Sequence, residues 1–136
     1  MMNNLLIDTN IIIDLLAKRA NFYQEAQELF TLADEKVIKL YISSLTFANS
    51  HYLLSKELNT NEVRKVLIKL KILVNILPLD DKILELALSS DFNDFEDAIQ
   101  YYTAEENNLN FIITRNKKDF KLSKLPVFTA REYLLR

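Results

Sequence analysis

The sequence contains no glycine, no cysteine and no tryptophan, and it has a single histidine among its 136 residues. Without glycine it has no P-loop, no dinucleotide-binding fingerprint and no nucleophile elbow, because all three depend on the backbone freedom of glycine. Without cysteine it has no disulfide, no thiolate zinc site and no thiol nucleophile. His51 alone cannot form a multi-histidine metal site. The chemistry of the chain must therefore rest on carboxylates.

A length of 136 residues, with 49% hydrophobic and 26% charged side chains, is typical of a single soluble domain, which we expect to span residues 1–136. No apolar run approaches the ~20 residues of a membrane span, and no signal-peptide pattern opens the chain. We therefore expect a cytoplasmic protein that enters no membrane. The net charge of −2 argues against holding nucleic acid by overall positive charge, but it permits a metal bridge with a local basic patch.

Short apolar segments alternate with segments of helical spacing along the chain. Strands are predicted at residues 5–7, 39–43, 75–78, 111–113 and 127–128, and helices at 11–16, 21–34, 44–58, 60–73, 80–88, 91–107 and after 129. This alternation is typical of an α/β domain whose parallel strands are joined by right-handed crossovers. Since glycine is absent, asparagine is expected to take its place at helix ends, as at residues 107–108.

The first strand ends at a cluster of polar residues, Asp8, Thr9 and Asn10. Residues 5–7 form an uninterrupted apolar run, which favours a strand buried on both faces in the middle of a parallel sheet. Ligands of open α/β sheets bind at the carboxyl ends of the strands, where Asp8 is expected. One of these three side chains also suffices to cap the following helix, so capping is the alternative explanation.

A second acidic cluster comprises Asp91, Asp94 and Asp97, at intervals of three residues. On a helix Asp94 and Asp97 share one face, where their charges repel each other. A helix N-terminus compensates part of this repulsion, and Mg²⁺ or Mn²⁺ would compensate more, because both ions prefer carboxylate oxygens. Helix capping is the alternative explanation for Asp91 and Asp94. It is favoured for Asp91 and explains Asp97 less well, because Asp97 is predicted to lie within the helix.

If the first and fourth strands are neighbours, Asp8 and Asn116 emerge side by side, and a helix packed at that edge adds Asp97. Such a ring of oxygen ligands positions a hydrated metal ion for attack on a phosphodiester. Asp119 either joins this site or is a solvated loop residue.

Positive charge is concentrated after the fourth strand, at Arg115, Lys117, Lys118, Lys121 and Lys124. Such side chains contact the phosphates of RNA in a sequence-independent and salt-sensitive way. The alternative is a solvated loop without a ligand. Arg115, Lys117 and Lys118 are the candidate RNA contacts.

Three segments, residues 6–10, 94–99 and 112–120, resemble in order and spacing the PIN domain family, and specifically its VapC-type toxins. The resemblance covers essentially the full chain. It implies a three-layer α/β/α fold around a mostly parallel sheet of four to five short strands. It also implies a Mg²⁺- or Mn²⁺-dependent ribonuclease, the toxin of a toxin–antitoxin pair, with an RNA substrate, a cognate antitoxin that blocks it, and a homodimeric state.

The resemblance assigns roles to individual residues. Asp8 and Asp97 would be the main metal ligands and Asp94 an additional one. The last acid of the family falls within residues 114–119, where Asn116 occupies the commonest position and Asp119 can serve instead. The polar side chains expected to support these acids are Thr9, Asn10, Asn49, Thr114 and Asn116.

The sequence departs from the family pattern at Asn49, where a glutamate is usual. An amide supplies a neutral oxygen, but it brings no charge and cannot act as a base. With Asn116 as well, weaker metal binding follows, so the alternative function is a PIN-like module that binds RNA or protein without catalysis. Phosphotransfer by a nucleophilic Asp8, as in haloacid dehalogenases, is less favoured because Asn10 stands where those enzymes have a second aspartate.

Overall fold

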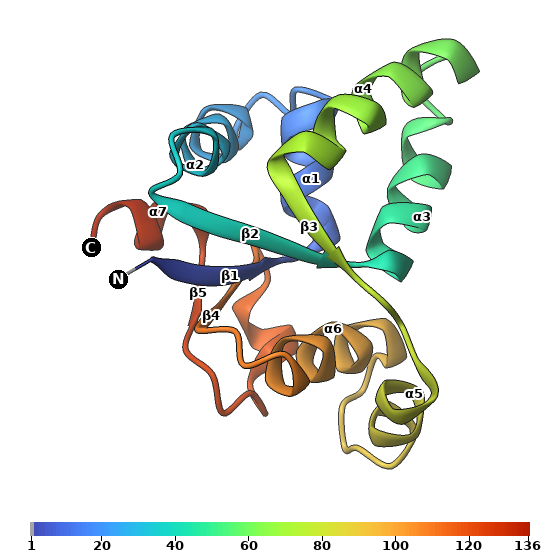
Figure 1. The fold of residues 1–136 in the computed structure, drawn as a ribbon, viewed down its shortest axis with the longest axis vertical. Coiled ribbons are helices and arrows are strands. Elements are labelled where there is room, and N and C mark those ends of the chain that lie inside the picture. The colour runs from blue at the N-terminus through green and yellow to red at the C-terminus, as the bar shows by residue number, and fades with distance from the viewer. Residues whose placement is uncertain (1) are drawn as a thin grey trace.

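The computed structural model describes residues 2–136, which form a five-stranded sheet covered by helices on both faces (Figure 1). All four strand pairings are parallel, and the strand order is β3-β2-β1-β4-β5. The strands are β1 (Asn3–Ile7), β2 (Ile38–Ser43), β3 (Val74–Leu77), β4 (Phe111–Ile113) and β5 (Val127–Phe128). The prediction of a three-layer α/β/α fold is therefore confirmed, with a sheet that is entirely parallel.

The helices divide between the two faces of the sheet. They are α1 (Thr9–Leu16), α2 (Tyr23–Asp34), α3 (Ser44–Leu54), α4 (Thr60–Leu73), α5 (Asp81–Leu88), α6 (Phe95–Glu106), the 3₁₀ helix η1 (Lys117–Phe120) and α7 (Ala130–Leu134). In Figure 1, α1 to α4 lie on one side of the sheet and α5 and α6 on the other. None of the helices within residues 2–136 is both long and apolar enough to span a bilayer.

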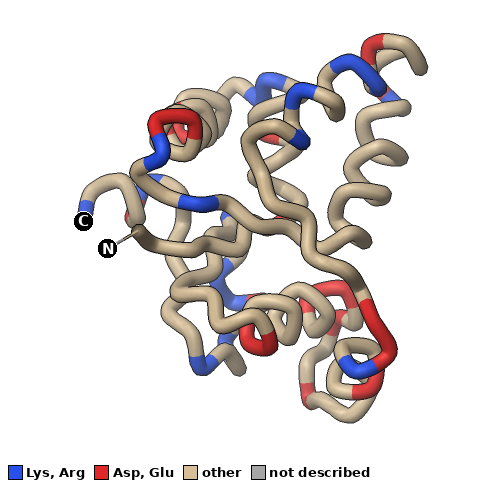
Figure 2. Tube along the Cα trace, viewed as in Figure 1, with Lys and Arg blue, Asp and Glu red and all other residues tan. Residues whose placement is uncertain are grey.

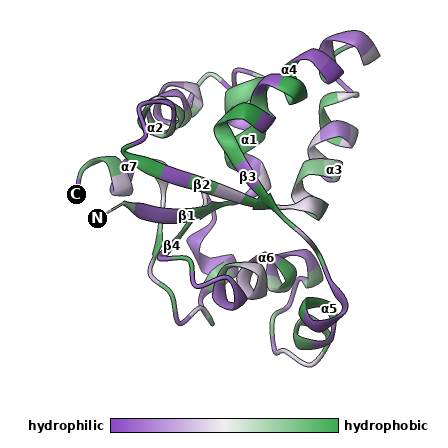
Figure 3. Cartoon of the chain, viewed as in Figure 1, coloured by the Kyte–Doolittle hydropathy of each residue, from purple (hydrophilic) through white to green (hydrophobic). Residues whose placement is uncertain are grey.

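The central strand β1 contributes to two of the three hydrophobic clusters among the described residues. Leu5 and Ile7 pack with α1, α2 and α4, whereas Leu6 faces the other way and packs with Tyr101 and Ala104 of α6. These three strand residues are completely buried, as the uninterrupted apolar run predicted. Figure 3 shows the hydrophobic colouring of the sheet reaching its carboxyl edge, where the polar residues that follow the strands begin.

Most helix boundaries lie within two residues of the prediction, but the end of α3 and the start of α6 differ by four. Helix α3 ends at Leu54 and not near Leu58, although Leu58 still packs against the core from the following turn. Helix α6 begins at Phe95, and its N-cap is Asp94, whose side chain accepts a hydrogen bond from the backbone N–H of Asp97. Asp94 therefore precedes the helix and does not lie within it, and the predicted capping role falls to Asp94 and not to Asp91.

Three residues within the described chain have left-handed backbones, namely Lys18, Lys36 and Asn108, each just after a helix. Asn108 confirms the expectation that asparagine replaces glycine, but the two lysines show that this expectation was too narrow. In each case the next residue donates a backbone hydrogen bond to a carbonyl five residues earlier, as Leu109 does to Ala104. This bond satisfies an end carbonyl and offsets the cost of the left-handed conformation.

Candidate active site at the carboxyl edge of the sheet

The site is built where the neighbouring strands β1 and β4 end. The backbone N–H of Asp8, the first residue after β1, donates to the carbonyl of Ile113, the last residue of β4, at 2.9 Å. Because of this bond, the loops that follow β1 and β4 lie next to each other, and Thr114 lies beside Asp8. The predicted neighbourhood of the first and fourth strands is confirmed.

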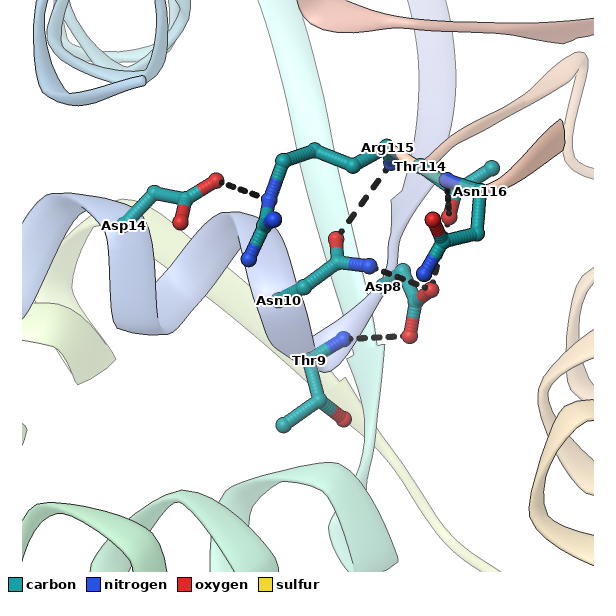
Figure 4. A network of polar contacts seen from close by, with 7 residues as sticks. All are labelled: Asp8, Thr9, Asn10, Asp14, Thr114, Arg115 and Asn116. Carbon is teal, nitrogen blue, oxygen red and sulfur yellow. Dashed lines mark hydrogen bonds and ion pairs between the residues drawn. The ribbon is translucent and has the colours of Figure 1, made fainter. Parts of the chain in front are cut away.

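Asp8 is nearly buried and its carboxylate accepts several hydrogen bonds (Figure 4). Oδ1 accepts from the backbone N–H of Thr9 at 2.7 Å, while Oδ2 accepts from the Thr114 hydroxyl at 2.7 Å and from the Asn10 amide at 3.2 Å. Burial raises the pKa of the Asp8 carboxyl above its ordinary value, and the bonds from Thr114, Gln100 and Thr9 oppose that rise. Asp8 thus caps α1 and also belongs to the site, so the two explanations offered for it are compatible.

The supporting polar residues tie the loop after β1 to the loop after β4. The Asn10 side-chain oxygen accepts from the backbone N–H of Arg115 at 3.5 Å, and the Thr114 hydroxyl accepts from the backbone N–H of Asn116 at 3.1 Å. Thr114 is completely buried, so its hydroxyl has one fixed environment. Figure 4 shows Asn10 and Asn116 on either side of the Asp8 carboxylate. These bonds hold Asp8 in one orientation at the edge of the sheet.

A cleft of about 690 Å³ opens in front of Asp8. Every acid predicted for the site lines it, because Asp94 and Asp97 come from the start of α6 and Asp119 from η1. Figure 2 shows acidic positions gathered around the start of α6. Asn49 of α3 and Asn116 also line the cleft, whereas Asp91 lines only a neighbouring depression among the described residues.

The pKa of the Asp97 carboxyl reflects both its burial and the acids around it. Burial is the first cause that raises the pKa of its carboxyl, to about 7, and the negative charges of Asp94, Asp8, Asp119 and Glu96 follow in that order. Burial and the four acidic neighbours therefore make the charged form of the Asp97 carboxyl unfavourable. A positive ion in the cleft would stabilise that charged form. Asp94 has one carboxylate oxygen bound to the N–H of Asp97, so its second oxygen is the one available for a ligand.

The donor set consists of carboxylate, amide and hydroxyl oxygens, which are the atoms that hard divalent cations prefer. Within residues 2–136, no three acidic or histidine side chains are already arranged as a metal cage. The acids that share the cleft nevertheless reach it from three elements, namely the β1–α1 junction, the start of α6 and η1. Such a cleft can bind a hydrated cation together with a phosphate ester beside it.

The three basic residues predicted to contact RNA do not lie together in the structure. Arg115 lines the cleft, with its Nε 2.8 Å from the buried Asp14 carboxylate and its guanidinium stacked 4.3 Å above the Phe22 ring. Lys117 turns away to pair with Glu132 at 3.1 Å, and Lys118 lines the neighbouring depression. Of the three candidate RNA contacts, only Arg115 therefore faces the cleft.

Several residues that line the cleft were not predicted from the sequence. Lys56 adds positive charge to it, Arg19 lines it in an ion pair with Glu57 at 2.9 Å, and Tyr52 of α3 adds an exposed ring. These positions gave no local signal, because they belong to segments whose proximity depends on tertiary packing. Gln100 was also missed, although it lies three residues after Asp97 and such spacing places two side chains on one helix face.

Comparison with known proteins gives consistent results. The sequence profile of the PIN domain family matches residues 4–118. The chain is 30% identical to Ribonuclease VapC1 of Aquifex aeolicus (strain VF5), over 96% of this chain and 92% of that protein. A toxin–antitoxin complex from Klebsiella pneumoniae contains a chain with 29% identity and a TM-score of 0.68, covering 93% of this chain and 97% of that one. DNA-bound VapBC from Salmonella typhimurium superposes with a TM-score of 0.71 at 18% identity, over 96% and 99%.

Proposed function

The chain belongs to the PIN domain family, and from that premise we propose that it is a metal-dependent endoribonuclease acting as the toxin of a toxin–antitoxin pair. The observation that carries the proposal is the convergence of Asp8, Asp94, Asp97 and Asp119 on one cleft. The relative from Aquifex aeolicus, which matches nearly the full length, is named a ribonuclease and supports the choice of RNA as substrate.

In this proposal Asp8 and Asp97 hold a Mg²⁺ or Mn²⁺ ion, with Asp94 and Asp119 adding negative charge. A bound divalent cation supplies Lewis-acid stabilisation of the phosphate and lowers the pKa of a coordinated water. The protein contributes the rest, since Thr9 and Thr114 fix the Asp8 carboxylate by hydrogen bonds of 2.7 Å each. The orientation of Asp8 therefore depends on its own helix start and on the loop after β4.

Arg115 is the proposed contact to the RNA backbone. Its guanidinium is restrained on two sides, by the ion pair with Asp14 and by stacking on Phe22. A restrained guanidinium loses little conformational entropy when it binds a phosphate. Lys56 borders the same cleft and extends this positive side, so an RNA strand would cross the site between these two cations and the acids.

A second candidate function is binding of RNA or protein without catalysis. The observation that favours it is the presence of two amides in the cleft, Asn49 and Asn116, at positions where the family resemblance leads us to expect acids. Neither amide can act as a base, and neither contributes charge to metal binding. The two functions differ in one measurable respect, which is whether a divalent cation binds and RNA is cut.

We also propose an antitoxin partner, a homodimeric state and a cytoplasmic location. The Klebsiella pneumoniae structure is a complex of a toxin with an antitoxin, and its toxin-like fold covers nearly all of this chain, which supports the partner. Tyr52 at the cleft and Ile72 of α4 are well exposed apolar side chains that a protein partner would cover. An RNA substrate is consistent with action in the cytoplasm.

The proposal is tested by measuring Mn²⁺ binding by calorimetry and cleavage of a labelled single-stranded RNA pool in the same buffer. We expect wild type to bind and cleave, and Asp97→Asn to do neither while keeping its circular dichroism spectrum. Asp91→Asn is the matched control, because Asp91 belongs to the same acidic segment but lines only the neighbouring depression. Mn²⁺ binding without RNA cleavage would overturn the proposed catalysis, and absence of Mn²⁺ binding to wild type would overturn the metal-dependent function and favour the binding module.

A further inference from the structure

Gln100 is a buried amide in the wall of the cleft. It lies on α6 one turn beyond Asp97, it is only 4% exposed, and it lines the cleft with Asp8 and Asn49. The adjacent α6 residues Ile99 and Tyr101 are apolar or aromatic core residues. A polar side chain in such a position costs free energy unless its donors and acceptor are satisfied.

The two ends of the Gln100 amide are in different situations. The side chain is close enough to the Asp8 carboxylate to oppose the burial-induced rise in the pKa of Asp8. The Oε1 atom is buried and has no hydrogen-bond partner within residues 2–136. Thr103, one turn further along α6, differs in this respect. It is completely buried, but its hydroxyl donates a hydrogen bond to the Ile99 carbonyl at 2.7 Å.

An unsatisfied acceptor in the wall of an acidic cleft is costly for the fold alone. A leucine of similar volume would fill the same space without that cost, because burying an unpaired polar atom is more unfavourable than replacing it with an apolar one. Because Gln100 lines the cleft, a donor bound there would satisfy Oε1. Waters of a hydrated divalent cation are such donors, since Mg²⁺ retains several waters when it is held by few carboxylates.

We propose, building on the metal-dependent function above, that Gln100 is a positioning residue of the site. Its amide N–H orients the Asp8 carboxylate, and its Oε1 accepts a hydrogen bond from the water shell of the divalent cation. Partners of this kind orient the ligands of metal sites, and their loss typically costs about 10- to 100-fold in affinity. The contribution matters more in this chain because Asn49 and Asn116 bring no charge to the cleft.

The test compares Mn²⁺ affinity by calorimetry, and the melting temperature in EDTA, for wild type, Gln100→Leu, Gln100→Glu and Thr103→Val. For Gln100→Leu we expect affinity to fall at least about 10-fold, with a melting temperature in EDTA equal to or above that of wild type. For Gln100→Glu, which keeps an acceptor oxygen but loses the N–H that orients Asp8, we expect an affinity between those of wild type and Gln100→Leu. Thr103→Val is the matched control, equally buried on the same helix, and we expect its Mn²⁺ affinity to be unchanged.

Each outcome separates this inference from the function on which it rests. Wild-type affinity in Gln100→Leu overturns the role of Gln100 while leaving metal binding intact. Affinity lost equally in Gln100→Glu and Gln100→Leu overturns the role of Oε1 as an acceptor. If wild type itself binds no Mn²⁺, the metal-dependent function fails, and the role of Gln100 fails with it.

Discussion

Asp97→Asn is expected to stabilise the protein in the absence of metal while it abolishes metal binding. The substitution keeps the shape of the side chain and removes a negative charge that faces four other acids. The backbone N–H of Asp97 still donates to Asp94, so the cap of α6 is preserved. The expected effect is therefore electrostatic, and its direction is opposite to that of an ordinary destabilising mutation.

The magnitude follows from the pKa of the Asp97 carboxyl, which rises from 3.8 to about 7 on folding, mainly through burial and then through neighbouring charges. At 1.36 kcal/mol per pH unit, such a rise corresponds to a cost of at most about 4 kcal/mol for the charged folded protein. Asp97 is only partly buried, so water and salt screen part of the repulsion, and the favourable effect of an acid at a helix N-terminus is also lost. We expect a net gain of about 1–2 kcal/mol in the free energy of unfolding.

The pH dependence of the free energy of unfolding shows whether the effect of Asp97→Asn comes from this charge. Because the folded state holds the Asp97 proton more tightly than the unfolded state, the wild-type free energy of unfolding should fall as pH rises from about 4 to about 7. The advantage of Asp97→Asn should therefore be small near pH 4 and complete above pH 7. Urea unfolding in EDTA at several pH values measures it. Added Mn²⁺ should reverse the order, because the ion stabilises only the protein that binds it.

Two results would refute this reasoning. One is an Asp97→Asn protein that is less stable than wild type in EDTA at pH 8, which would mean that the Asp97 carboxylate makes a favourable contact in the folded state. The other is a stability difference of the same size at pH 4 and pH 8, which would assign the effect to packing and not to charge. Asp91→Asn is the control, since Asp91 is absent from the groups that raise the pKa of Asp97.

Three further predictions concern the surroundings of the cleft. Arg115→Ala leaves the Asp14 carboxylate buried and unpaired, and we expect a loss of about 2 kcal/mol in urea unfolding at pH 7, most of which a second substitution, Asp14→Asn, should restore. Without such restoration, the loss would have to come from the Phe22 stacking. Thr114→Val removes the hydroxyl that donates to Asp8 and should weaken Mn²⁺ binding about 10-fold in calorimetry; unchanged affinity would show that the hydroxyl does not position Asp8. Asn49→Glu places a carboxylate in the cleft and should tighten Mn²⁺ binding by about 10-fold or more, whereas weaker binding would place Asn49 too far from the ion.

The central strand and most helix starts could be predicted because their causes are local. A strand buried on both faces needs an apolar side chain at every position, and residues 5–7 provide one. Asn59, Asp80 and Thr129 each accept a bond from the backbone N–H three residues later, so a cap is recognisable from a few adjacent residues. Element order followed from these signals, and the parallel sheet followed from the element order.

The errors arose where two residues offer the same local signal. Asp91 and Asp94 are both good caps, and only the path of the chain after α5 selects Asp94. Leu58 continues the apolar pattern of α3, yet it reaches the core from a turn. The left-handed Lys18 and Lys36 are likewise permitted by the bonds that close the ends of α1 and α2.

The sequence by itself determined the order of strands and helices, the place of Asp8 at a strand end and the kinds of side chain available for chemistry. Carboxylates were the remaining candidates for chemistry once glycine, cysteine and multiple histidines were absent, and the resemblance to the PIN domain family then assigned roles to particular acids. Only the tertiary structure decided which polar residues share the cleft, separating Arg115 from Lys117 and adding Gln100. The physical reason is that a cap or a buried strand depends on neighbours along the chain, whereas a cleft depends on side chains from several packed elements.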